Sequence, residues 1–187
     1  MFIGGDSVRI TQPDGGGQTG STLQILKEGK PIGQFFSLEY AGKNTSGVSQ
    51  YVAKDGSLTT NPGIGTDYHY VGSPQPKLLL GWTNDFKYKN FDLNIFIRGV
   101  FGSKIFNATR ADLFRPITAN TSNILVDAGD ESPTDLNVYK YSSRFIESGN
   151  YIRLDNATLG YNFKNLGKSV KNLRLYVPGS NLFIITW

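Results

Sequence analysis

The sequence predicts an all-β protein whose antiparallel strands form part of a transmembrane β-barrel. Three observations support this prediction. Apolar and polar residues alternate along several strands, turn-forming polar stretches separate the strands, and the later connections alternate between short and long. This rhythm is typical of outer-membrane barrels, in which strands of about ten residues are joined by short periplasmic turns and long outer loops.

Composition fits a β-rich chain and excludes some kinds of site. Apolar residues make up 39% of the 187 residues and charged residues 18%, while aromatic residues reach 13% and there are 22 glycines. No cysteine is present, which excludes disulfides, thiolate metal ligands and a cysteine nucleophile. The net charge of +4 is spread along the chain without a basic block, so we expect no nucleic-acid partner.

The first predicted strands lie at residues 22–27 and 32–40. In the second, even-numbered side chains form an apolar face interrupted by a glutamine, and odd-numbered ones point the other way: Ile32, Phe36, Leu38 and Tyr40 against Gly33, Ser37 and Glu39. Residues 41–76 are rich in Gly, Ser, Thr, Asn and Asp. They predict a long loop with at most a short strand near residues 49–53.

The clearest strands, at residues 77–88 and 91–99, predict a hairpin that turns at Lys89 and Asn90. Its two faces differ in polarity. We expect one face to contact lipid through Leu78, Leu80, Trp82, Leu93, Ile95 and Ile97, with Phe86, Tyr88 and Phe91 beside the turn as an interface girdle. We expect the other face to line the lumen with Asp85, Lys87, Asp92, Asn94 and Arg98. Each of these either contacts substrate or plug, or simply solvates the wall.

After the hairpin, residues 103–149 form a long excursion with a short helix predicted within residues 103–114 and an acidic, polar middle. Two further strands follow at about 150–163 and 172–186, joined by residues 164–171. We therefore expect the turn at Lys89 and Asn90 to be periplasmic and the long connections to be extracellular.

Alternation alone fits a soluble β-sandwich as well, because such sheets also bury one face and solvate the other. The alternative is thus a secreted all-β carbohydrate-binding module. Long strands, aromatic residues beside the short turn and long links on one side favour the barrel.

The residues predict neither an enzyme nor a cofactor or metal site. His69 is the only histidine and has no evident nucleophile or second ligand near it in sequence. The carboxylates of the excursion do not have the spacing of an EF-hand, so a solvated loop is expected for Asp127, Asp130, Glu131 and Asp135.

Aromatic side chains in the long loops are candidate ligand contacts. They either stack on sugar rings, pack the loops together or pack against a lid protein; the set is Tyr68, Tyr70, Tyr139, Tyr141 and Phe145.

Several blocks resemble one family. "GSPQPKLLLGWTNDFKYKNFDLNIFIRGVFGSKIFNATR" at 72–110, "SSRFIESGNYIRLDNATLGYNF" at 142–163 and "NLRLYVPGSNLFIITW" at 172–187 resemble the late strands of SusC/RagA-family outer-membrane proteins, in the same order. "EGKPIGQFF" at 28–36 resembles a shorter family element upstream.

This resemblance implies a TonB-dependent transporter of the bacterial outer membrane, with a barrel of about 22 strands occluded by an N-terminal plug. It implies membrane lipid, a SusD-like surface lipoprotein and TonB as partners, and import of oligosaccharides or peptides. Residues 1–187 would be a partial C-terminal barrel region without the plug, the TonB-contacting segment, a signal peptide or the last closing strands. An incomplete barrel with long extracellular loops is therefore expected.

Overall fold

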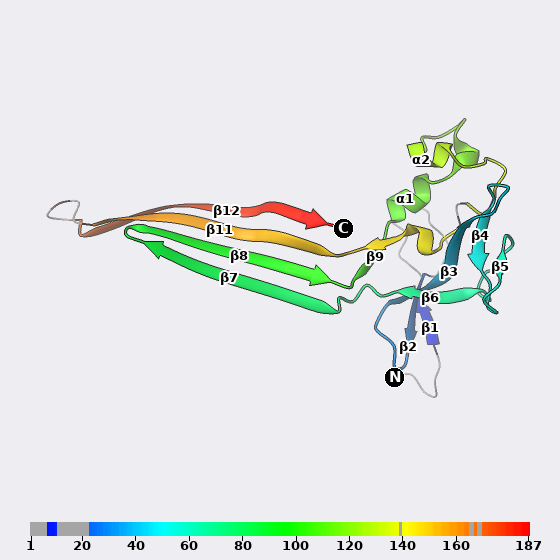
Figure 1. The fold of residues 1–187 in the computed structure, drawn as a ribbon, viewed down its shortest axis with the longest axis horizontal. Coiled ribbons are helices and arrows are strands. Elements are labelled where there is room, and N and C mark those ends of the chain that lie inside the picture. Colours follow the sequence, from blue (N-terminus) through cyan, green and yellow to red (C-terminus); the bar gives the residue numbers. More distant parts are fainter. Residues whose placement is uncertain (1–6, 11–22, 139, 165–166, 168–169) are drawn as a thin grey trace. The chain divides into compact units, whose positions relative to one another are not determined.

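The computed structural model describes residues 7–10, 23–138, 140–164, 167 and 170–187 (Figure 1). Its chain divides into two compact units. We call Pro76–Ser103 with Gly149–Trp187 the sheet unit, and Met1–Gln75 with Lys104–Ser148 the loop unit. Nearly all regular structure is antiparallel strand, as the sequence predicts.

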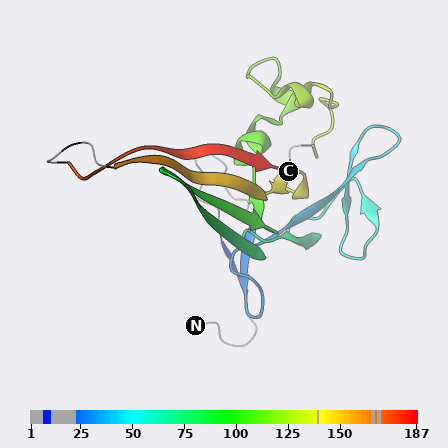
Figure 2. The same ribbon diagram turned by 60° about the vertical axis from the view of Figure 1, so that its left-hand side comes forward.

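The sheet unit is one four-stranded antiparallel sheet in the order β12-β11-β8-β7. It consists of β7 (Leu78–Tyr88), β8 (Phe91–Phe101), β11 (Tyr151–Lys164) and β12 (Asn172–Thr186), which lie side by side in Figures 1 and 2. Eleven residues, as in β7 and β8, extend about 37 Å at about 3.4 Å per residue. A strand of that length, tilted by about 40°, is long enough to cross an apolar band about 25 Å tall.

The connections of this sheet differ between its two ends. Tyr88 pairs with Phe91, so only Lys89 and Asn90 form the first turn, and Lys89 has a left-handed φ of 55°. The last residue of β11 and the first of β12 lie at the same end, whereas β8 and β11 are joined at the opposite end by the long excursion. The predicted up-and-down order with alternating short and long connections is confirmed.

Two irregularities mark β11 and β12. A β-bulge interrupts the register of β11 between Leu154 and Asn156 toward both neighbouring strands. Pro178 lies within β12, opposite Thr158 of β11, and provides no backbone N–H for pairing.

In the loop unit, the strands pair in the order β1-β2-β3-β4-β5, and β6 also pairs with β3, over Phe35–Leu38. Their bounds are β1 (Ser7–Ile10), β2 (Gln24–Lys27), β3 (Gln34–Lys43), β4 (Ser49–Val52), β5 (Leu58–Thr59) and β6 (Tyr68–Gly72). The expected short strand near 49–53 is therefore present as β4. In contrast, β5 and β6 lie in a region that the sequence predicted to be loop.

Burial along β3 departs from the predicted alternation. Phe35 is 2% exposed and Ser37 is also buried, although neither belongs to the predicted apolar face, whereas Ile32 is 72% exposed. The register toward β6 shifts between Phe35 and Phe36. Both faces of β3 are covered at Ser37 and Leu38, since these adjacent residues are each 1% exposed. On the Ser37 side, the hydroxyl donates to the Tyr141 carbonyl at 2.9 Å.

The long excursion folds into short elements rather than remaining a loop. These are β9 (Lys104–Phe106), α1 (Ala108–Leu113), η1 (Pro116–Thr118), α2 (Val126–Gly129), η2 (Ser143–Phe145) and β10 (Ile146–Ser148), with β9 and β10 paired. The predicted helix is confirmed by α1, which Asn107 caps by accepting the Arg110 N–H at 2.9 Å. The hydrophobic core of the excursion contains Ala111, Phe114, Ala128, Val138 and Phe145.

Carboxylates of the excursion attach it to β3 and β4. Glu131 is buried and forms ion pairs with Arg144 and, at 2.8 Å, with the Lys43 Nζ. Asp135 is also buried and accepts the Ser49 N–H at 2.7 Å. The expectation of a solvated acidic loop is therefore wrong for these two residues, because each carboxylate has a partner from a distant strand.

Tyr51 of β4 is fully buried and also contacts the excursion. Its hydroxyl donates to the Asn137 carbonyl at 2.5 Å, and the Asn137 amide donates to the Thr60 carbonyl at 2.5 Å. Burial raises the pKa of the Tyr51 phenol above its ordinary value. The hydroxyl therefore stays protonated and able to donate at neutral pH.

Among the residues described, no helix combines the length and apolarity needed to cross a membrane.

Candidate functional site: a sheet with one apolar and one polar face

The register of the sheet unit brings apolar side chains of all four strands onto one face. Cross-strand partners share a face, so Phe86, Leu93, Leu159 and Val177 form one row across the sheet. Exposure on this face is high, at 57% for Trp82 and 74% for Val177. The predicted lipid-facing set shares this face: Leu78, Leu80, Trp82, Leu93, Ile95 and Ile97. Asn84, opposite Ile95, is a polar exception.

Aromatic side chains gather on this face beside the Lys89–Asn90 turn. Phe91 contacts Tyr161 edge to face with ring centroids 4.7 Å apart, and Tyr161 contacts Phe163 in the same way at 4.6 Å. Beside them is an open hollow of about 370 Å³, bordered by Phe86, Lys87, Tyr88, Phe91, Leu93 and Leu159. The three predicted girdle residues thus lie together at one end of the apolar face.

The opposite face carries the residues predicted to line the lumen, which are Asp85, Lys87, Asp92, Asn94 and Arg98. Asp85 and Asn94 are cross-strand partners, and the Asn94 amide donates to Asp85 Oδ1 at 2.7 Å. Lys87 is directly opposite Asp92. This face also includes some apolar side chains, such as Phe96.

Asp92 takes part in a contact that spans three strands. Its carboxylate forms an ion pair with Arg174 of β12 and accepts the Asn162 amide at 2.8 Å. Gly160 of β11 is the residue between them, and a Cβ there would lie 2.6 Å from Asp92 Oδ2 and 2.8 Å from the Arg174 guanidinium. Because Gly160 has no side chain, Asp92 of β8 and Arg174 of β12 can contact each other across β11.

A second charged cluster lies at the bulge. Arg98 and Arg153 are opposite each other in the register, which would bring two like charges together. Asp155, at the bulge, forms ion pairs with both, at 2.9 Å from the Arg98 Nε to its Oδ2. A bulge changes the direction of a side chain, so this irregularity supplies the carboxylate that the arginine pair needs.

The sequence prediction included Asp92 and Arg98 but missed their partners Arg174, Asn162, Asp155 and Arg153, and the spacer Gly160. A usable signal existed only for Arg174 and Asn162, which continue the polar alternation of β12 and β11. Asp155 is found only once the bulge is known.

The loop aromatics fall into two groups. Tyr68 and Tyr70 of β6 both contact Phe36, at centroid distances of 5.8 and 5.0 Å, and Tyr70 is 40% exposed. Phe145 is fully buried in the excursion core, and Tyr141 packs beside that core. These two therefore follow the predicted alternative of loop packing rather than ligand contact. Tyr139 lies outside the described residues.

No group of three or more metal-ligating side chains occurs within the described part of the chain. His69 lies in β6, opposite Ser37 in the register.

Relatives and solved structures resemble this chain. It is 34% identical over 186 residues to "TonB-dependent receptor P3" of Formosa agariphila, covering 87% of this chain and 18% of the relative. It is 30% identical over 151 residues to "TonB-dependent receptor SusC" of Bacteroides thetaiotaomicron, covering 74% of this chain and 14% of that protein. The "RagAB peptide importer in the 'closed-closed' state" matches 100% of this chain with a TM-score of 0.75 at 17% identity.

This chain belongs to the SusC/RagA-like TonB-dependent receptors.

Such receptors lie in the bacterial outer membrane, to which this SusC/RagA-like chain is therefore assigned. The same importer in its "open-open" state matches with a TM-score of 0.73 at 18% identity, covering 21% of that structure's chain. No protein-family model matches the sequence. The chain spans less than a fifth of the length of the two curated relatives described above.

Proposed function

We propose that the receptor containing this chain takes up nutrients across the outer membrane, and that the sheet unit is part of the wall of its barrel. The observation that supports this most strongly is the apolar face of β12-β11-β8-β7, which the described residues leave uncovered. Side chains such as Trp82, Phe86 and Val177 are more than half exposed there. A large exposed apolar surface marks contact with a membrane or with another protein.

The alternative of a secreted carbohydrate-binding module fits this sheet less well. A β-sandwich buries the apolar face of each sheet against a second sheet about 10 Å away. In the sheet unit, the four-stranded sheet has no such partner among the described residues. Its edge strands β7 and β12 also suit a barrel, in which further strands pair with them.

The polar face would then line a watery lumen. Charged groups there, such as the Asp92–Arg174 pair and the Arg98–Asp155 pair, remain partly exposed to solvent. The same groups facing lipid at mid-membrane would cost about 2–4 kcal/mol for each arginine. We therefore assign Leu93, Ile95 and their row partners to lipid and Asp92, Asn94 and Arg98 to the lumen.

The two ends of the sheet suggest the orientation. Short periplasmic turns and long extracellular loops are typical of these barrels, so the Lys89–Asn90 turn is assigned to the periplasmic side. The loop unit, which follows the opposite end of the strands along the chain, is assigned to the outer vestibule. Within it, Tyr68 and Tyr70 are the aromatic side chains that we assign to ligand contact.

The proposed partners and substrates rest on the relatives. One relative is named SusC and the solved structures are named as a RagAB peptide importer. By analogy we propose a SusD-like surface lipoprotein as lid, TonB contact through a region outside residues 1–187, and oligosaccharide or peptide cargo. The receptor would act without breaking bonds and without a cofactor, as a conduit and not an enzyme.

Uptake by cells tests this function. A strain lacking the full-length receptor is supplied with labelled oligosaccharides or labelled peptides, with and without the restored gene and with and without TonB. We expect accumulation of one substrate class that requires both the receptor and TonB. Equal accumulation in all four strains for both classes would refute the proposal.

A further inference from the structure

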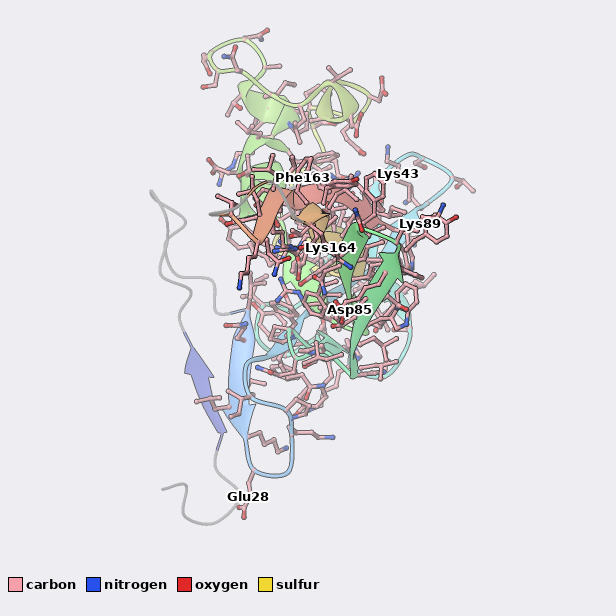
Figure 3. The ribbon with its side chains drawn as sticks, turned by 90° about the vertical axis from the view of Figure 1, so that its left-hand side faces the viewer. Glu28, Lys43, Asp85, Lys89, Phe163 and Lys164 are labelled. Atoms are coloured by element: carbon pink, nitrogen blue, oxygen red, sulfur yellow. The ribbon has the colours of Figure 1, made fainter. Side chains whose placement is uncertain are left out.

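The polar face has a basic hollow beside the Lys89–Asn90 turn. Its volume is about 490 Å³, and it is bordered by Lys87, Lys89, Phe91, Asp92, Asn162, Lys164, Asn172 and Arg174. Figure 3 looks along the strands from this end and shows Lys164 and Phe163 on opposite sides of the sheet. The hollow therefore draws on all four strands and has a size typical of small-ligand sites.

Positive charge in this hollow exceeds negative charge. The single bordering carboxylate, Asp92, is already paired with Arg174 and accepts the Asn162 amide. In the described part of the chain, no ion pair joins Lys87, Lys89 or Lys164 to a carboxylate. In the sequence, residues 165–171, "NLGKSVK", contain two lysines and no acidic residue.

The rest of the polar face does not share this excess. Arg98 and Arg153 are both paired with Asp155 at the bulge. Asp85 accepts a hydrogen bond from the Asn94 amide. Unpaired basic charge is thus concentrated at the turn end, where the hollow lies.

We propose that this hollow binds carboxylate groups of the transported substrate, which makes the preferred cargo an anionic chain. This inference rests on the proposed function, because that function turns the polar face toward the lumen. The ammonium groups of Lys87 and Lys164 attract a carboxylate and donate charge-assisted hydrogen bonds to it. Lys89 borders the same hollow, but its Nζ lies 5.3 Å from the Tyr88 ring centroid, so it adds positive charge without facing the anion directly. The Asn172 side chain also borders the hollow and can contact neighbouring hydroxyl or amide groups of the ligand. The Asp92–Arg174 pair keeps the one bordering carboxylate neutralised, so it does not repel an anion.

Direct binding tests the site in the full-length receptor purified in detergent. Triglutamate is compared with triglutamine, and an oligogalacturonate with its neutral methyl ester, by calorimetry at low and high salt. The variant carries Lys87→Gln, Lys89→Gln and Lys164→Gln. The matched control is Lys77→Gln, which removes an exposed lysine at the other end of β7.

The triple variant should weaken binding of the anionic ligand roughly three- to 160-fold at low salt, because exposed charge pairs contribute about 0.2–1 kcal/mol each and three lysines are removed. High salt should shrink this difference, since it screens exposed charges. Lys77→Gln and the neutral ligands should show no change. Whether the peptide or the saccharide pair responds identifies the source of the carboxylate.

Equal affinity of the wild-type receptor for the anionic and neutral members of both pairs would overturn the site. The same conclusion would follow if the triple variant bound the anion as tightly as Lys77→Gln does. These outcomes are independent of the uptake experiment: receptor-dependent uptake without charge preference would refute the site alone. Absence of any receptor-dependent uptake would refute the proposed function.

Discussion

The assignment of faces can be tested by placing one arginine on each side of β8. Leu93 and Ile95 belong to the apolar face, while Asn94 between them belongs to the polar face. Phe96 is the middle of β8, so Leu93 is three residues and Ile95 one residue from the strand centre. With about 3.4 Å per residue and a tilt of about 40°, Ile95 lies roughly 3 Å and Leu93 roughly 8 Å from mid-membrane.

These depths set the expected cost. Ile95→Arg should destabilise the assembled barrel by about 2–4 kcal/mol, and Leu93→Arg by about 1–3 kcal/mol because it lies closer to the interface. Asn94→Arg should cost close to nothing, since its neighbour Asp85 offers a carboxylate in a hydrated lumen. A loss of about 2.8 kcal/mol reduces the assembled-to-unassembled ratio about a hundredfold.

The assay is the heat-modifiable gel shift of the full-length receptor in isolated outer membranes. We expect folded protein in the order Asn94→Arg, Leu93→Arg, Ile95→Arg, from most to least. Leu93→Ala and Ile95→Ala separate the loss of an apolar side chain from the addition of charge. Equal tolerance of arginine at the three positions would refute the face assignment.

Three further predictions concern individual contacts. Gly160→Ala should separate Asp92 from Arg174 and lower the temperature of the gel shift. Gly81→Ala should not, because a Cβ at Gly81 meets only the Phe96 ring, at 3.5 and 3.8 Å. Equal temperature shifts for the two variants would contradict the spacer role of Gly160. Arg144→Met should leave the negative charge of the buried Glu131 only partly compensated and cost about 3–5 kcal/mol of stability. Residues 104–148 should then become sensitive to limited proteolysis, whereas Asp130→Asn, which changes an exposed side chain, should leave them protected. An unchanged cleavage pattern in Arg144→Met would argue against the attachment of the excursion to β3 and β4. Tyr51→Phe should cost about 1 kcal/mol for the lost hydrogen bond. Burial raises the pKa of the Tyr51 phenol in the folded state above its unfolded-state value near 10. The stability that Tyr51 contributes is therefore fully present below about pH 10 and is lost as the pH rises further, so Tyr51→Phe should reduce the loss of stability at alkaline pH. An identical dependence of stability on pH for the two proteins would contradict this.

Strands with strict alternation were predictable from sequence, because a period of two identifies both the strand and its faces. The two-residue turn between β7 and β8 follows from that pattern, and the predicted bounds of these strands differ from the observed ones by at most two residues. Short strands such as β6 were missed because they lie within residues 41–76, a segment rich in Gly, Ser, Thr, Asn and Asp. Pairing with β3 stabilises β6, and local propensity does not reveal this pairing.

The polar contacts were less predictable, because they depend on which strands become neighbours. Asp92 and Arg174 meet only because β11 lies between β8 and β12 and has a glycine at the crossing point. Asp135 resembled a solvated loop residue, since its partner Ser49 is 86 residues away. Distances of this kind along the chain leave no periodic signal in the sequence.

The central claim is that β8 separates lipid from a watery lumen, and site-directed spin labelling tests it most directly. The natural sequence of this chain has no cysteine, so single cysteines introduced from Phe91 to Phe101 give unambiguous label positions within it. In the full-length receptor in membranes, we predict that odd-numbered labels are accessible to oxygen and even-numbered labels to a water-soluble nickel complex, with a period of two. Equal accessibility of odd and even positions to both reagents would contradict the account.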